Sequence, residues 1–149
     1  MALPLEADGE ADAAYRLEDQ IGHLLRRAHQ RATAVFLDAM GEFELTPTQY
    51  AALVKIGDVG EISQNHLGRL TAMDPATSQG VIRRLHAHGL INVRPDPDDR
   101  RRTLLSLSAA GKRVLPAAIA RGRDITRTTL APLAEDEQAA LLALLKRLT

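Results

Sequence analysis

The spacing of apolar residues along this 149-residue chain predicts its secondary structure. Over residues 13–41 the apolar positions recur every three or four residues, which is the period of a helix with one apolar face. The same period returns over residues 47–57, where Thr46 can cap a helix, and in two shorter stretches that follow Ser63 and Asp74. We therefore expect one long amphipathic helix followed by three short helices.

Beyond Gly89 the spacing becomes that of strands. Residues 90–94 and 103–107 are short apolar stretches on either side of a charged loop. Helical spacing then returns after Ser108, which can cap a helix that reaches about residue 133, and a last helix is expected over residues 138–148. This order predicts a mainly α protein with a small β-hairpin, arranged as a winged helix-turn-helix domain plus a helical dimerisation region.

The apolar surplus lies in the helices at the two ends of the chain. They carry more large apolar residues than one small winged domain can cover, so we expect them to bury that surface in a homodimer. The expected division is a disordered tail in residues 1–12, a dimerisation helix in residues 13–44, a DNA-binding winged helix-turn-helix in residues 45–107 and C-terminal dimerisation helices in residues 108–149.

Composition excludes several classes of protein. The chain has no cysteine, so it can form no disulfide and no thiolate metal site. No apolar run approaches the roughly 18 residues that span a bilayer, and the acidic N-terminus is unlike a secretory signal. We therefore expect a cytoplasmic protein with no membrane partner. The motifs of hydrolases and of phosphate-binding enzymes are missing, so we expect no enzyme activity and no cofactor.

Charge is distributed unevenly, although the net charge is zero. Residues 62–113 hold nine Lys or Arg and four Asp, and the rest of the chain carries the compensating excess of acid. The positive segment contains the sequence RPDPDDRRR at the tip of the predicted hairpin. Arginines at such a tip can pair with phosphates or enter a narrow groove, while the aspartates hold some of them in place. A solvated hairpin tip whose charges pair only with each other is the alternative interpretation.

Three segments carry a resemblance to a known family. They are LTPTQYAAL at residues 45–53, DPDDRR at residues 96–101 and LSLSAAG at residues 105–111, with Arg84-Leu85 and Gly89-Leu90-Ile91 between them. In the order and spacing of these segments the chain resembles the MarR family of bacterial winged-helix transcription regulators. The resemblance implies a homodimeric repressor that binds a near-palindromic double-stranded DNA operator. It also implies release from that operator by a small aromatic acid or phenolic effector.

The resemblance also implies which residues contact DNA. In the wing, Asp99 orients Arg101, which enters the minor groove, and Arg100 is their basic neighbour. The recognition helix begins at Pro75, and its exposed start offers side chains to base edges or phosphates. The expected DNA-binding residues are Pro75, Ala76, Thr77, Ser78, Gln79, Arg83, Arg84, Asp99, Arg100 and Arg101.

Gly80 departs from the pattern of the family, in which many members have arginine at this position. Glycine inside a helix costs about 1 kcal/mol relative to alanine. Two explanations stay open: the backbone approaches DNA closely at Gly80, or the contacts shift to Gln79 and Arg83.

The residues expected to bind the ligand are His29, Arg31 and Tyr50. The first two border the apolar stripe of the long helix and can offer a charge to an acid, and the tyrosine can stack or hydrogen-bond. For each of them ordinary packing or exposure to solvent is the alternative. His86 and His88 are two residues apart on a helix, so they face different directions and we expect no metal site there.

A second class of function stays open on the sequence alone. A winged helix-turn-helix can use its hairpin as a protein–protein interaction module without specific DNA binding. Binding that persists at high salt would favour that class, because contacts to DNA phosphates weaken steeply as salt rises.

Overall fold

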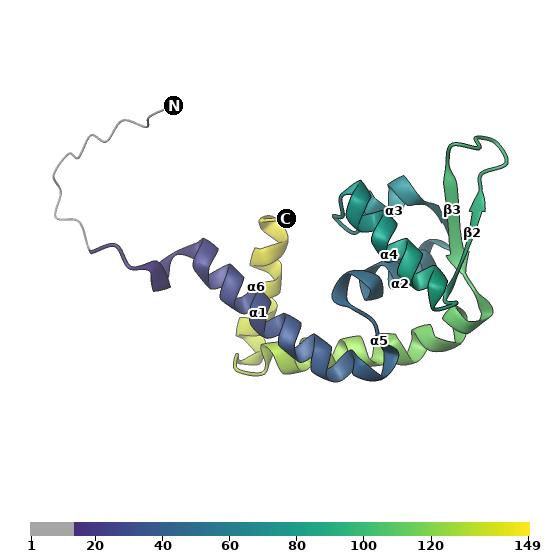
Figure 1. The fold of residues 1–149 in the computed structure, drawn as a ribbon. Coiled ribbons are helices and arrows are strands. Elements are labelled where there is room, and N and C mark those ends of the chain that lie inside the picture. Colours follow the sequence, from purple (N-terminus) through teal and green to yellow (C-terminus); the bar gives the residue numbers. More distant parts are fainter. Residues whose placement is uncertain (1–13) are drawn as a thin grey trace, which may run out of the picture.

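The computed structural model describes residues 14–149 (Figure 1). In chain order its elements are η1 (Leu17–Asp19), α1 (Ile21–Met40), η2 (Gly41–Phe43), α2 (Pro47–Val59), β1 (Glu61–Ser63), α3 (Gln64–Leu70), α4 (Pro75–Ala87), β2 (Ile91–Pro95), β3 (Thr103–Leu107), α5 (Ala109–Leu130) and α6 (Glu135–Arg147). The mainly α fold with a β-hairpin is therefore confirmed. The tail predicted for residues 1–12 lies outside the described residues.

The predicted caps set the starts of four helices. The backbone N–H of Gln49 donates to Thr46 Oγ1 at the start of α2, and the Gln49 side chain accepts from the Thr46 N–H in return. Ser63, Asp74 and Ser108 accept in the same way from the third residue after them, at the starts of α3, α4 and α5. A cap of this kind satisfies a backbone donor that the helix leaves free, and each contributes about 1 kcal/mol.

The ends of the chain differ from the prediction in detail. The first helix does not begin at residue 13: Gln20 has an extended backbone (φ −83°, ψ 132°), which separates η1 from α1. The fifth helix ends at Leu130 and the last begins at Glu135, three residues earlier than expected, because the Glu137 carboxylate accepts the Ala134 N–H and closes the first turn.

The sheet has three strands in the order β1-β3-β2, all antiparallel. Strand β1 was not predicted. It lies on the far side of β3 from β2 and pairs Ile62 with Leu105, both of which are buried. The β2–β3 hairpin pairs Ile91 with Leu107 at its base and Pro95 with Thr103 at its tip.

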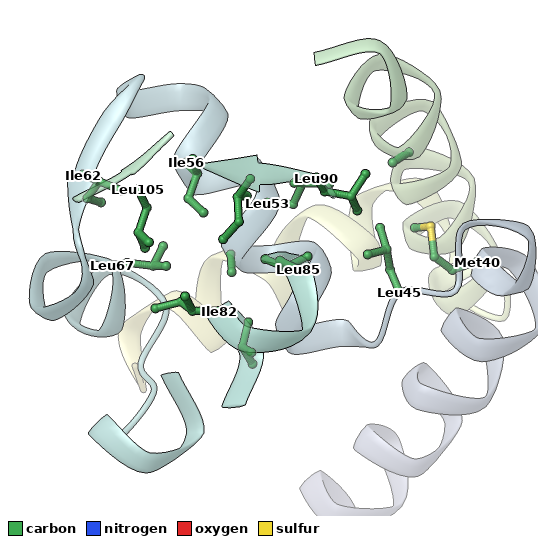
Figure 2. Close-up of a cluster of buried hydrophobic side chains, with 14 of the residues drawn as sticks. Met40, Leu45, Leu53, Ile56, Ile62, Leu67, Ile82, Leu85, Leu90 and Leu105 are labelled. Carbon is green, nitrogen blue, oxygen red and sulfur yellow. The ribbon is translucent and has the colours of Figure 1, made fainter. Parts of the chain in front are cut away.

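The main apolar core lies inside the winged unit, which we define as α2 to β3. Figure 2 shows Leu53, Ile56, Leu67 and Leu85 pointing toward one another from three helices, with Leu105 of β3 beside them; each is fully buried. Burial of one such side chain contributes about 1.5–3 kcal/mol. This core fixes the position of α4 relative to the hairpin.

A helical arm of α1, α5 and α6 extends away from the winged unit (Figure 1). Helix α1 packs along α5, and the Arg31 guanidinium donates to the carbonyl oxygens of Thr128 and Thr129 at 3.1 and 3.3 Å. Helix α6 buries none of its residues within the single chain, and the arm exposes large apolar side chains. They are Ile21, Leu24, Leu25, Leu37, Leu141, Leu142, Leu144 and Leu148. None of the helices in residues 14–149 has the length and apolar character needed to cross a membrane.

Candidate nucleic-acid interface

Helix α4 has a rigid, well-capped N-terminus. Asp74 accepts the Thr77 N–H at 2.8 Å and the Thr77 hydroxyl at 2.9 Å, and Pro75 occupies the first helical position. These hydrogen bonds, led by the one from the Thr77 backbone, lower the pKa of Asp74. Its negative charge at the positive end of the helix dipole stabilises the first turn. The start of α4 is therefore held by hydrogen bonds within the protein.

The outward face of α4 agrees with the sequence analysis at all but one position. Ala76, Thr77, Gln79, Arg83 and Arg84 are exposed, as is Pro75 at the helix start. Ser78 is not: it is only 2% exposed.

Ser78 packs between the two helices of the helix-turn-helix. Its Oγ lies 3.0 Å from the place where a Cβ on Gly68 would stand, and no described residue forms a hydrogen bond with it. The expectation that Ser78 lies on the exposed start of the helix is therefore wrong. Its spacing from Val81, Ile82 and Leu85 places it on the buried face, where its small size allows α3 to approach α4 closely.

The wing loop, residues 96–102, is held by its aspartates. Asp96 is 8% exposed; its N–H donates to the Arg102 carbonyl, and its carboxylate accepts the Asp98 N–H, both at 2.9 Å. The Arg102 N–H donates in turn to the Asp99 carbonyl. Asp96 is thus a structural residue that closes the loop across the hairpin.

Asp99 holds Arg101 in a defined position. Asp99 Oδ1 accepts both the backbone N–H and the Nε–H of Arg101, at 3.1 and 3.2 Å. These hydrogen bonds, the backbone one first, lower the pKa of Asp99, so the carboxylate is charged at neutral pH. The Arg101 side chain is nevertheless 92% exposed. The aspartate therefore orients the arginine without removing it from solvent, and Arg100 next to it is also exposed.

A polar cleft of about 170 Å³ lies between the wing and α3. It is lined by Ser63, Gln64, Asn65, Arg101, Arg102 and Thr103. The side-chain amides of α3 lie on one side of this cleft and the guanidinium groups of the wing on the other, so the cleft is suited to an anion such as a phosphate. The DNA-binding residues predicted from the sequence do not include Gln64, Asn65 or Arg102, which line this cleft. Ser63 as the cap of α3 was a usable signal for the first two, because the first helix of a helix-turn-helix crosses the DNA backbone.

An ion pair joins the two outer strands of the sheet close to the wing loop. The Arg94 guanidinium on β2 makes a bidentate contact with the Glu61 carboxylate on β1, with Nη2 to Oε1 at 2.9 Å and Nε to Oε2 at 3.2 Å. Both side chains are about half exposed, so the pair adds little stability, but it spans β3 diagonally. Arg94 is therefore engaged within the protein.

The three residues expected to bind a ligand have different neighbours. His29 lines an apolar cavity of about 430 Å³ between α1, α5 and α6, and Arg31 is bonded to the carbonyls near the end of α5. Tyr50 packs edge-on against Phe36, with ring centroids 5.7 Å apart, and its hydroxyl end lies over Gly122. Burial raises the pKa of Tyr50, and Arg123 opposes this shift. The ligand roles of these residues stay predictions.

Tyr50 belongs to the junction between the arm and the winged unit. Phe36 is on α1, Tyr50 on α2 and Gly122 on α5, so three helices meet at this ring. A second link at the junction is the ion pair between Arg121 Nη2 of α5 and Glu42 Oε1 of η2, at 2.6 Å. These contacts hold α2 and η2 against α1 and α5.

Comparison with known proteins places this geometry in context. A model of the MarR family matches residues 43–102. The HTH-type transcriptional repressor NicR of Pseudomonas putida is 38% identical over 134 residues, which cover 90% of this chain and 85% of that protein.

Solved structures agree over the whole fold. A probable transcriptional regulator from Pseudomonas aeruginosa is 54% identical, with a TM-score of 0.86, over 90% of this chain and 100% of that chain. BpsR of Bordetella bronchiseptica is 36% identical. The DNA binding of BpsR is regulated by 6-hydroxynicotinic acid. Its TM-score is also 0.86, over 91% of this chain and 97% of that chain.

Proposed function

Because this chain belongs to the MarR family of transcriptional regulators, we propose that it is a homodimeric repressor that a small aromatic acid or phenolic ligand releases from its operator. The observation that carries the proposal is the wing, in which Asp99 holds an exposed Arg101 across a polar cleft from α3. A protein of this kind acts in the cytoplasm, on DNA, without enzyme activity and without a cofactor.

In this proposal α4 enters the major groove and the wing enters the adjacent minor groove. The contacts come from Pro75, Ala76, Thr77, Gln79, Arg83, Arg84, Arg100 and Arg101, with Asp99 as the residue that positions Arg101. Ser78 acts indirectly, through the packing of α4 on α3. Residues 45–107, which include the winged unit, are the DNA-binding part, and residues 13–44 and 108–149 form the dimer.

The dimer is supported by the exposed apolar face of the arm. Leu141, Leu142 and Leu144 of α6 are 36–54% exposed in the single chain, and no residue of α6 is buried. A second copy that covers this face about a two-fold axis would place two recognition helices about one DNA turn apart, roughly 34 Å. That spacing suits a near-palindromic operator.

The ligand class follows from the relatives and from the junction. BpsR is regulated by 6-hydroxynicotinic acid, which is a hydroxylated aromatic acid. An acid of this class that binds near the arm, with its carboxylate close to His29 or Arg31 and its ring near Tyr50, would favour one position of the winged unit. It releases DNA only to the extent that it binds that position better, and a coupling of about 5- to 150-fold is typical.

We expect operator DNA and 6-hydroxynicotinic acid to weaken each other's binding by the same factor, because coupling between two sites is reciprocal. Isothermal titration of the acid into the protein, with and without a saturating operator duplex, measures one side of the cycle, and titration of the duplex measures the other. Cyclohexanecarboxylate, which keeps the carboxylate but has no aromatic ring, is the control ligand and should bind more weakly.

The variants His29→Ala, Arg31→Ala and Tyr50→Phe locate the ligand. At least one of them should lose affinity for the acid while it keeps affinity for the operator. If all three variants bind the acid with the affinity of the parent protein, the predicted pocket is wrong. If the acid binds tightly but leaves operator affinity unchanged, the proposed control by ligand is wrong.

A further inference from the structure

The outermost ridge of α4 is almost free of side chains. At 3.6 residues per turn, Ala76, Gly80, Arg83 and Ala87 lie opposite the buried face formed by Ser78, Val81, Ile82 and Leu85. Among the four outward positions Arg83 is the one that extends beyond Cβ. Because these side chains are short, the backbone of α4 can approach the floor of a DNA groove closely. Arg83 is then the long side chain of this ridge that can contact the bases.

Gly80 and Arg83 are neighbours on this ridge. A Cβ placed on Gly80 would have the Arg83 Nη2 as its nearest neighbour, at 3.9 Å, which is ordinary van der Waals contact. The guanidinium of Arg83 therefore lies back over Gly80, toward the N-terminus of α4. Gly80 is only half-buried, whereas Arg83 is exposed, so the guanidinium lies over the glycine and still faces outward.

The other polar side chains at the start of α4 are engaged or lie to one side. The Thr77 hydroxyl donates to the Asp74 carboxylate, and Ser78 is buried. Gln79 and Arg84 are exposed on the flanks of the ridge. Arg83 is therefore the residue of α4 that is best placed to reach base edges.

We propose that Gly80 and Arg83 together set the sequence preference of this protein: the missing side chain at Gly80 lets the Arg83 guanidinium lie across the ridge and read a guanine. Arginine pairs with guanine O6 and N7 through two parallel hydrogen bonds, which lysine cannot form in the same geometry. The inference rests on the proposed function, since it specifies how α4 recognises the operator.

The probe is a set of duplexes that the wild-type protein selects from a randomised pool, together with copies in which each G·C pair is replaced in turn by A·T. Wild-type protein should lose roughly 5- to 150-fold in affinity when the guanine of either half-site is replaced. Arg83→Lys should discriminate between the selected and the substituted duplex several-fold less than the wild type, because an ammonium does not reproduce the planar guanidinium pair. It should keep its affinity for a shuffled duplex, because the charge is retained.

Gly80→Leu tests the partner position. A long neutral side chain there displaces the guanidinium, so this variant should lose the same discrimination as Arg83→Lys although Arg83 is present. Gly80→Ala, whose Cβ fits at 3.9 Å, should keep the preference. Arg113→Lys, at an exposed arginine of α5 outside the proposed DNA contacts, is the matched control and should discriminate like the wild type. Thermal melts check that each variant is folded.

The outcomes separate this inference from the proposed function. Selection by the wild type that Arg83→Lys and Gly80→Leu leave intact would overturn the inference and preserve the proposed function. A wild-type protein that selects no sequence from the pool would overturn both. A preference lost in Arg83→Lys but intact in Gly80→Leu would overturn the role of Gly80.

Discussion

Replacement of Arg101 by alanine is expected to weaken operator binding by roughly 5- to 150-fold per protomer, without loss of stability. The side chain is 92% exposed and contacts Asp99 within its own loop, so its removal takes nothing from the core. Fluorescence anisotropy with a labelled operator measures the affinity, and a thermal melt measures the stability. Arg147→Ala, which removes the same charge from the last turn of α6, is the control and should bind like the wild type.

Asp99→Ala tests whether the aspartate positions Arg101, because the two possibilities predict opposite changes in affinity for DNA. Removal of a negative charge near DNA would by itself strengthen binding, because it lowers repulsion by phosphates. If Asp99 acts by holding Arg101, the variant should instead bind more weakly. In the double variant, the loss of Asp99 should then add nothing to the loss of Arg101. Tighter binding by Asp99→Ala would show that the aspartate does not position the arginine for DNA.

Replacement of Gly111 by alanine is expected to cost at least about 1–3 kcal/mol, the range for an overpacked core, and to lower Tm by several degrees. An alanine Cβ would overlap the carbonyl oxygen of Leu90 and lie 3.1 Å from its carbon. Both atoms are backbone, so neither can rotate away. The same oxygen accepts the Ser108 N–H at 3.0 Å, which ties the start of α5 to the end of the helix-turn-helix.

Calorimetry of Gly111→Ala and Gly41→Ala provides the comparison. Gly41 has an ordinary helical backbone and nothing within 4 Å of its missing Cβ, so alanine should be tolerated there. Equal melting temperatures for Gly111→Ala and the wild type would mean that α5 can move away from Leu90 at little cost. That result would contradict tight packing of the start of α5 against the Leu90 backbone.

Local signals in the sequence were sufficient to predict where the helices of the winged unit begin. Thr46, Ser63, Asp74 and Ser108 can each accept a backbone N–H three residues later, and that chemistry needs no tertiary contact. The hairpin was likewise predictable from the change in period after Gly89. The aspartates and arginines of the wing could be interpreted because they lie within one short loop.

Features that depend on distant pairing could not be predicted in the same way. Strand β1 has three residues and exists because β3, about forty residues later, offers it an edge. The cleft between α3 and the wing is lined by Asn65 and Arg102, which are distant in the sequence and meet there because β1 pairs with β3. The spacing of Ser78 from Leu85 could have predicted its burial, but its polar side chain suggested exposure. Ser78 is buried because Gly68 of α3 approaches it closely.

The central claim is that two copies of this chain recognise one DNA sequence. Its most direct test is an equilibrium titration of the protein against a duplex selected from a randomised pool and against a shuffled duplex of the same composition, both at physiological salt. We predict saturation at two protomers per selected duplex and an affinity for it at least about 1,000-fold higher than for the shuffled duplex. Equal affinity for the two duplexes, or saturation at one protomer, would contradict the account.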